Sequence, residues 1–250
     1  MRLARFIGLG LSSLLVLSAC SNDEKEEKEV VEEETTTTAE NEEVTEEVKI
    51  DDETLQKVVD KSSDIDSYHT SLEVDAELDG EVEEAMNVEV EYVDGNPPEI
   101  ALKSSDVLRT ISKDGRTYFN NDEEWVEITD SIDEGALFRV TYQKVVNTLM
   151  TVKDELEREE VDGNYVYKFK GKNQNIYHAI EKLLHMNLGE IDVSNHDIEL
   201  EFVVDEDYFI RSLAFNIAIE DEEGTVNLKG ESIFDSFNEI DGIEVPDEIK

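Results

Sequence analysis

The sequence predicts an α+β fold in which a curved antiparallel sheet, or half-barrel, of about ten strands carries helices on its concave face. Three observations predict it. Most of the chain after residue 66 alternates apolar and polar residues with period two, which is typical of strands with one buried face. Asp-Gly and other turn pairs separate these segments. Two internal stretches change to helical periodicity, and their apolar stripes are suited to covering the inner face of the sheet.

Residues 1–19 are predicted to be a signal peptide. Arg2 and Arg5 precede an apolar run from Phe6 to Leu17, which is the order of a charged and then a hydrophobic region in secretory signals. The run has 12 residues, and a helix needs about 20 to cross a bilayer. We therefore expect this segment to direct export and then to be removed.

The run ends in Leu17-Ser18-Ala19-Cys20, which resembles the lipobox of bacterial lipoproteins. The resemblance implies that the signal is cut before Cys20 and that a lipid such as palmitate is attached to it. Cys20 is then the lipid-attachment site, and the expected location is the extracellular face of the cell membrane. Cys20 is also the only cysteine, so we expect no disulfide within the domain.

Residues 20–51 are predicted to form a disordered acidic tether behind the acylated cysteine. Residues 21–53 contain 16 Asp and Glu against three Lys, with no aromatic residue, Gly or Pro. Such a segment has little apolar surface to bury, and its like charges repel one another. The tether leads to one predicted domain, residues 52–250.

The formal net charge is -43, from 65 Asp and Glu against 22 Lys and Arg. This excess excludes nucleic acid as a partner and repels anionic lipid headgroups, so we expect membrane contact only through the lipid on Cys20. The sequence leaves open whether the acidity is an adaptation to high salt or high pH or a means of binding cations.

The first half of the domain reads as a short helix followed by a meander of strands. Asp51 or Asp52 is placed to cap the first turn of this helix, and Leu55 and Val58 lie on its apolar face. The strands that follow are expected at 68–78, 86–92, 100–103, 107–113, 116–119 and 125–128.

The second half is expected to hold both internal helices and the remaining strands. A helix over residues 134–158 has an apolar stripe that runs from Phe138 to Leu156, and a helix with a stripe from Ile176 to Leu188 is expected to be capped by Gly189. The remaining strands are expected at 165–169, 198–204 and 213–219, and from residue 226 onward.

The order of these parts resembles the half-barrel lipoproteins related to the outer-membrane lipoprotein carriers and the mycobacterial lipid-binding lipoproteins, and most closely their uncharacterised Gram-positive members. The segments that carry the resemblance are Ser67-Tyr68-His69-Thr70, Gly115-Arg116-Thr117-Tyr118 before Trp125, and Asp205-Glu206-Asp207-Tyr208. The resemblance implies a concave pocket for acyl chains. Inward residues of alternating strands would line it: Leu72, Val74, Met86, Val88, Phe202, Phe215 and Ile217.

No motif predicts catalysis or a bound metal. His178 and His185 share a helix face with Glu181, but seven residues span about 10 Å of helix, which is too far for one ion. The four histidines have no nucleophile motif near them, and with 65 carboxylates a pair at glycosidase distance is expected by chance. We expect no metal, no cofactor and no enzymatic activity.

Two functions remain ahead of an envelope hydrolase. The first is a surface-anchored, non-enzymatic lipoprotein that binds a lipid or other apolar ligand in its concave pocket. The second is a structural lipoprotein, or one that contacts a protein or wall polymer, whose half-barrel is filled by its own helices. A cavity of at least about 300 Å³ under the helices would favour the first.

Overall fold

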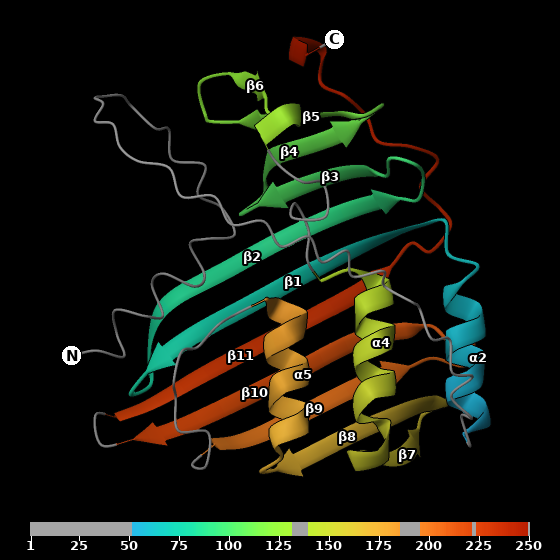
Figure 1. The fold of residues 1–250 in the computed structure, drawn as a ribbon, viewed down its shortest axis with the longest axis vertical. Helices are drawn as coiled ribbons and strands as arrows, with labels where there is room; N and C mark the ends of the chain where they lie inside the picture. The colour runs from blue at the N-terminus through green and yellow to red at the C-terminus, as the bar shows by residue number, and fades with distance from the viewer. Residues whose placement is uncertain (1–51, 132–139, 186–195, 222–223, 250) are drawn as a thin grey trace, which may run out of the picture.

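A computed structural model describes residues 52–131, 140–185, 196–221 and 224–249. Within these ranges the chain forms one antiparallel sheet of eleven strands, which is curved and unclosed, with helices packed on its concave face (Figure 1). The predicted fold class is confirmed. No helix in the described ranges has the length and apolar character that a bilayer crossing requires.

The α-helices are α2 (Glu53–Ser62), α4 (Tyr142–Val152) and α5 (Gln174–Leu184), and the 3-10 helices are η2 (Thr129–Ser131), η3 (Lys153–Glu155) and η5 (Asp247–Ile249). The strands are β1 (Ser67–Leu78), β2 (Glu81–Val93), β3 (Glu99–Ser104), β4 (Val107–Lys113), β5 (Arg116–Asn120), β6 (Trp125–Glu127), β7 (Glu157–Val161), β8 (Asn164–Gly171), β9 (His196–Val204), β10 (Ile210–Asp221) and β11 (Gly224–Asp235).

The strand order is β6-β5-β4-β3-β2-β1-β11-β10-β9-β8-β7. The first six strands therefore meander away from one side of β1, and the last five lie on its other side. This arrangement pairs the first strand with the last in the middle of the sheet, where Val74 lies opposite Gly230. The chain returns from β6 to β7 through α4, and α5 connects β8 to β9, so both helices lie across β8–β11 in Figure 1.

The Asp-Gly pairs make the predicted hairpin turns. Asp79-Gly80, Asp114-Gly115 and Asp162-Gly163 all have positive φ at both residues, which two-residue hairpins require and which glycine adopts without steric cost. The β3–β4 turn also has positive φ at both of its residues, Ser105 and Asp106, although neither of them is glycine. Local turn chemistry therefore determines most of the meander.

The opening helix is confirmed, and Asp52 is the one of the two predicted candidates that caps it. The Oδ1 atom of Asp52 accepts hydrogen bonds from the backbone N–H groups of Thr54 and Leu55, at 2.8 and 3.4 Å. These bonds satisfy two of the amide groups that a helix start leaves without partners.

The boundaries of the helix predicted over 134–158 are partly wrong. The regular helix α4 begins at Tyr142, with the Thr141 side chain as cap, and ends at Val152. Residues 157 and 158 belong instead to β7, a strand that the sequence did not predict. All five residues of β7 are exposed, so this edge strand has no apolar alternation to show in the sequence.

The predicted cap of α5 is also wrong. The helix ends at Leu184, and the left-handed residue that ends it is His185, with φ +51°. Glycine is the usual residue at the left-handed position that ends a helix, and for this reason the sequence predicted Gly189 and not a histidine. Leu188 and Gly189 lie outside the described residues.

The core lies between the sheet and the two long helices. The apolar stripes of α4 and α5 and the inward residues of β1, β2, β3, β8, β9, β10 and β11 form one buried cluster. Its largest fully buried side chains come from both layers: Leu149, Ile176, Ile180, Leu200, Phe202, Ile217 and Phe234. The concave side beneath α4 and α5 is therefore filled by protein.

A smaller core lies on the outer face of β3 and β4, where the C-terminal segment packs. Ile243 is 2% exposed and contacts Ala101 and Ile111. Its backbone is held on both sides, because its carbonyl accepts from Lys113 Nζ at 2.6 Å and its N–H donates to Glu99 Oε2 at 2.9 Å. The last residues of the chain thereby cover apolar side chains that would otherwise face water.

Gly230 is the position in the middle of the sheet where only glycine fits. A Cβ there would lie 2.3 Å from Cζ of Phe215, a neighbour on β10. We expect Gly230→Ala to lower the free energy of unfolding by about 1–3 kcal/mol, measured by urea denaturation, because it overpacks the core. In the Gly230→Ala background, Phe215→Leu should cost less than it does alone. An unchanged free energy for Gly230→Ala would contradict this packing.

Buried tyrosines predict loss of stability at alkaline pH. Burial raises the pKa of Tyr68, Tyr142 and Tyr167, and it raises that of Tyr177 to about 12. An exposed phenol has a pKa of about 10, so the unfolded chain loses these protons first as pH rises. The contribution of these buried phenols to the free energy of unfolding is thus complete below about pH 10, and it is lost progressively above that pH.

Urea denaturation at about pH 8, 10 and 11 checks this sign. The free energy of unfolding should fall between the second and third values, and Tyr177→Phe should make that fall smaller. A free energy that stays constant up to pH 11 would show that these phenols are not shielded in the folded protein.

Candidate ligand-binding groove between α4 and α5

A groove of about 310 Å³ lies between the two helices that cover the concave face. Four residues of α4 and three of α5, together with the residue that ends α5, line it: Lys144, Asn147, Thr148, Thr151, Ala179, Lys182, Leu183 and His185. The helices run antiparallel, because the start of α4 meets the end of α5 at the contact between Lys144 and His185. The groove therefore has two chemically different ends.

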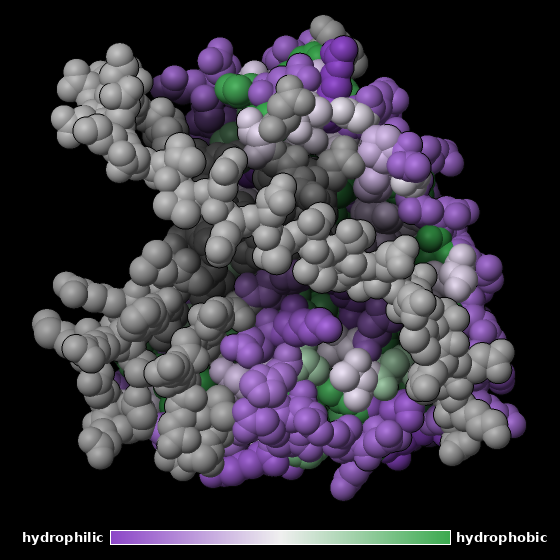
Figure 2. Space-filling model, in the orientation of Figure 1, coloured by the Kyte–Doolittle hydropathy of each residue, from purple (hydrophilic) through white to green (hydrophobic). Residues whose placement is uncertain are grey.

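The walls of the groove offer mainly apolar surface. Thr148 Oγ1 donates to the carbonyl of Lys144 at 2.8 Å, and Thr151 Oγ1 donates to the carbonyl of Asn147 at 2.7 Å. Because both hydroxyl protons are committed to α4 itself, these threonines have their methyl groups to offer a ligand. Ala179 and Leu183 supply the facing wall from α5. In Figure 2 small hydrophobic areas show between the polar side chains over these two helices.

Three nitrogen-bearing side chains lie at one end of the groove: Lys144, Lys182 and His185. The Nζ atom of Lys144 lies 3.5 Å from Nε2 of His185, and Lys182 lies one turn before His185 on α5. Among the described residues no Asp or Glu lines the groove. Lys144 and His185 each make a further interaction besides the one with each other.

The backbone at His185 is held in a costly conformation. A non-glycine residue in the left-handed region costs about 1–2 kcal/mol, although histidine is among the residues more often found there. The N–H of His185 donates to the carbonyls of Glu181 and Lys182, and these bonds end the helix. A glycine would make the same cap with less strain and would remove the imidazole from the groove.

A second cavity, of about 630 Å³, lies where the start of α2 meets η3, β7 and β8. Asp52 is at its centre, and its carboxylate is already occupied: Oδ1 caps α2, and Oδ2 accepts from the Tyr167 hydroxyl at 3.0 Å. Arg158 lies 3.7 Å from the same carboxylate. Both acidic and basic side chains line this cavity, and we interpret it as the polar junction that holds α2 to the edge of the sheet.

The seven predicted pocket residues lie on the inner face of the sheet. Leu72, Val74, Val88, Phe202, Phe215 and Ile217 are buried, and Met86 is half-buried. They pack in the core against the helices, and none of them lines either of the two cavities described above. Their contact with a ligand stays a prediction. Cys20 lies outside the described residues.

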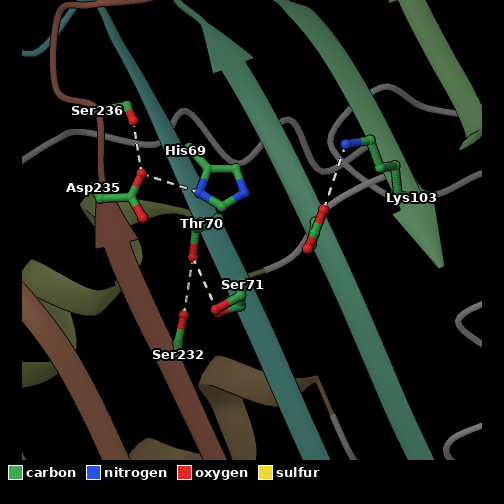
Figure 3. Close-up of polar contacts among 8 residues, drawn as sticks. His69, Thr70, Ser71, Lys103, Ser232, Asp235 and Ser236 are labelled. Carbon is green, nitrogen blue, oxygen red and sulfur yellow. Dashed lines mark hydrogen bonds and ion pairs between the residues drawn. The ribbon is translucent and has the colours of Figure 1, made fainter. Parts of the chain in front are cut away.

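His69 on β1 is part of a short polar chain (Figure 3). Its Nδ1 lies 3.1 Å from Asp235 Oδ1, and the same oxygen accepts from the Ser236 hydroxyl at 2.7 Å. The serine is thus bonded to the carboxylate and not to the imidazole, so this arrangement does not activate a nucleophile.

The other histidines are not brought together. His178 pairs with Glu181 at 3.3 Å, whereas His185 meets Lys144. His196 is 3% exposed, and neither of its ring nitrogens has a hydrogen-bond partner. Among the described residues no three His, Cys, Asp or Glu side chains are grouped as a metal site would need, and the absence of a metal stays a prediction.

Sequence reasoning missed the groove because it followed the apolar stripes, which face the sheet. The signal that was present lies on the opposite side of the same helices. Residues 140–153 contain no Asp or Glu, although the chain as a whole is highly acidic. A helix without acidic residues, with Lys144, Asn147 and Thr151 on its outer side, departs from the composition of the rest of the chain.

The residues 109–250 match the family described as "Family of unknown function (DUF6612)". No curated protein matches the sequence. Among solved structures, a LolA superfamily protein from Nitrosomonas europaea is similar at 10% identity and a TM-score of 0.27, covering 78% of this chain and 96% of that chain. A DUF1329 family protein from Desulfovibrio piger is similar at 10% identity and a TM-score of 0.22, covering 76% and 93%.

With TM-scores this low, the two structural likenesses carry no argument. The half-barrel that the resemblance implied is present, and the closeness to Gram-positive members stays a prediction. The half-barrel fold itself follows from the strand order and from the packing of α4 and α5 on the concave face.

Proposed function

We propose that this chain, which belongs to DUF6612, a family of unknown function, is a non-enzymatic lipoprotein. It would bind a lipid or other apolar ligand. A lipid on Cys20 holds it at the extracellular face of the cell membrane. The observation that carries the binding role is the groove between α4 and α5, whose described lining is mainly apolar.

The anchoring half of the proposal is supported by the sequence. Leu17-Ser18-Ala19-Cys20 follows a signal-like segment, and residues 21–53 hold 16 acidic residues that repel one another. A self-repelling tether is extended, so it places the domain away from the lipid surface. The groove would then meet ligands outside the headgroup layer.

The binding half of the proposal is supported by the dimensions and the lining of the groove. Its volume is at the lower end of the range of about 300–1,000 Å³ that small-molecule sites occupy. Apolar walls with a few polar groups at one end are the usual composition of such sites. The occupant would be held on the helices that cover the half-barrel and not between them and the sheet.

A second candidate function is a structural role or an interaction with a protein or wall polymer. The observation that favours it is the filled core, since six of the seven predicted pocket residues are buried between sheet and helices. In this alternative the groove stays empty.

Native mass spectrometry of the mature chain, residues 20–250 with Cys20→Ala, separates the two. We expect an apolar ligand to co-purify, and extraction should identify it. Ala179→Trp, which fills the groove from its half-buried wall, should abolish that ligand without lowering the melting temperature. Gln143→Trp, which adds the same bulk on an exposed position of α4, is the control. A ligand-free chain that also fails to bind an added fluorescent fatty acid would favour the structural role.

Cys20→Ala in the full-length chain is expected to release the protein from the membrane. Cys20 is the only cysteine, so the variant has no thiol to which the lipid could be attached. Membrane binding would then need another anchor, such as a basic patch that contacts anionic lipids. Detergent-phase partitioning measures the effect. Retention of the variant in the membrane fraction, as for the unmodified sequence, would refute the lipobox interpretation.

A further inference from the structure

We propose that the outer face of β3–β6 is a peptide-binding surface whose partner is an extended segment of another protein, rich in aliphatic and basic residues. In the structure the end of this chain, residues 240–249, occupies the surface, and we call this segment the C-terminal strap. The partner segment takes the place of the strap. The inference is independent of the groove between α4 and α5.

The sheet holds the strap as it would hold a bound peptide, through one buried side chain and through the main chain. Ile243 is 2% exposed and packs in the smaller core with Ala101 and Ile111. The carbonyl of Ile243 accepts from Lys113 Nζ at 2.6 Å, and its N–H donates to Glu99 Oε2 at 2.9 Å. Lys113 and Glu99 also pair with each other at 3.2 Å. Together they present one donor and one acceptor to the main chain that lies over them.

These contacts do not require the strap to be joined to β11. Residues 240–246 are irregular, and the remaining contacts of the strap with this surface are apolar, through Ile240, Val245 and Ile249. In Figure 1 the strap ends near β5 and β6. Main-chain hydrogen bonds combined with a pocket for a side chain are a common means of recognising extended peptides. A separate segment of similar shape can therefore make the same contacts.

The charge of the strap is unfavourable for the place that it occupies. Residues 240–249 contain four acidic residues and no Lys or Arg, in a chain with a formal net charge of -43. Asp241, Glu244 and Glu248 are exposed and take part in none of the ion pairs of the described residues. An excess of one sign of charge destabilises a compact state through self-repulsion. A segment with lysines at these positions keeps the apolar and main-chain contacts and is attracted to the acidic surface.

Cations of the sheet near the strap are balanced by acids of the sheet. Lys113 is paired with Glu99, and Arg116 lies near Glu127. These pairs leave the negative charge of the strap without compensation from this part of the sheet. Charge complementarity therefore selects a basic partner segment.

Trp125 reports on the occupant, because it is the only tryptophan of the chain and packs against the smaller core. The test uses the mature chain, residues 20–250 with Cys20→Ala, and peptides that contain no tryptophan. One peptide has the sequence of residues 240–249. In the lysine peptide, Lys replaces the four acidic residues of that sequence. The control peptide is the lysine peptide with Asp in place of the isoleucine that corresponds to Ile243.

We expect the lysine peptide to bind the mature chain and to change the emission of Trp125. It should also speed amide hydrogen exchange in residues 243–249, because it displaces the strap. The peptide of natural sequence should bind at least about tenfold more weakly, because it carries the acidic residues of the strap. The control peptide should not bind.

Ile243→Asp in the mature chain should release the strap, since it places a charge in the smaller core. The lysine peptide should then bind about tenfold more tightly than it binds the unmodified strap, because a tethered competitor at an effective concentration on the order of millimolar is gone. Ile233→Asp changes an isoleucine of β11 that is 43% exposed, and as the matched control it should leave the affinity unchanged. If Ile243→Asp does not fold, the exchange experiment on the chain with its natural strap decides.

Three results would overturn the inference. Failure of the lysine peptide to bind, or binding that leaves Trp125 and the exchange of residues 243–249 unchanged, would show that the strap is a permanent part of the fold. Equal binding of the control peptide would reveal unspecific attraction of cations to an acidic protein. Equal binding of the natural-sequence peptide would identify the strap of a second copy as the occupant.

Discussion

Two hydrogen bonds made by tyrosine hydroxyls position α4 on the sheet, and the groove depends on them. The Tyr68 hydroxyl on β1 accepts from the backbone N–H of Tyr142, the first residue of α4, at 3.2 Å. The Tyr142 hydroxyl in turn accepts from the N–H of Ile210, where β10 begins, at 2.9 Å. All three residues are buried, so a shift of the helix would leave amide groups without partners in the core, at about 1–3 kcal/mol each. The rings of Phe234 and Phe237 pack against Tyr142 and complete this junction.

The same junction fixes the apolar side of α4 against the sheet, so the candidate groove lies on the other side of the helix. An open sheet of eleven strands has an apolar concave face that must be covered, and the stripes of α4 and α5 cover it over β8–β11. The opposite sides of the two helices take no part in that core, and a groove lies between them. Filling the half-barrel and binding a ligand on the outer side of the helices are therefore compatible.

Features that depend on neighbouring residues were predictable from the sequence, and features that depend on distant ones were not. The strands of the meander, their Asp-Gly turns and the Asp52 cap each follow from a few adjacent side chains. The pairing of β1 with β11 joins residues about 150 or more positions apart and has no signal in either segment alone. Strand β7 was missed because an exposed edge strand lacks alternation, and the groove was missed because its walls come from two helices. His185 was missed because its backbone conformation is unusual for a side chain of its type.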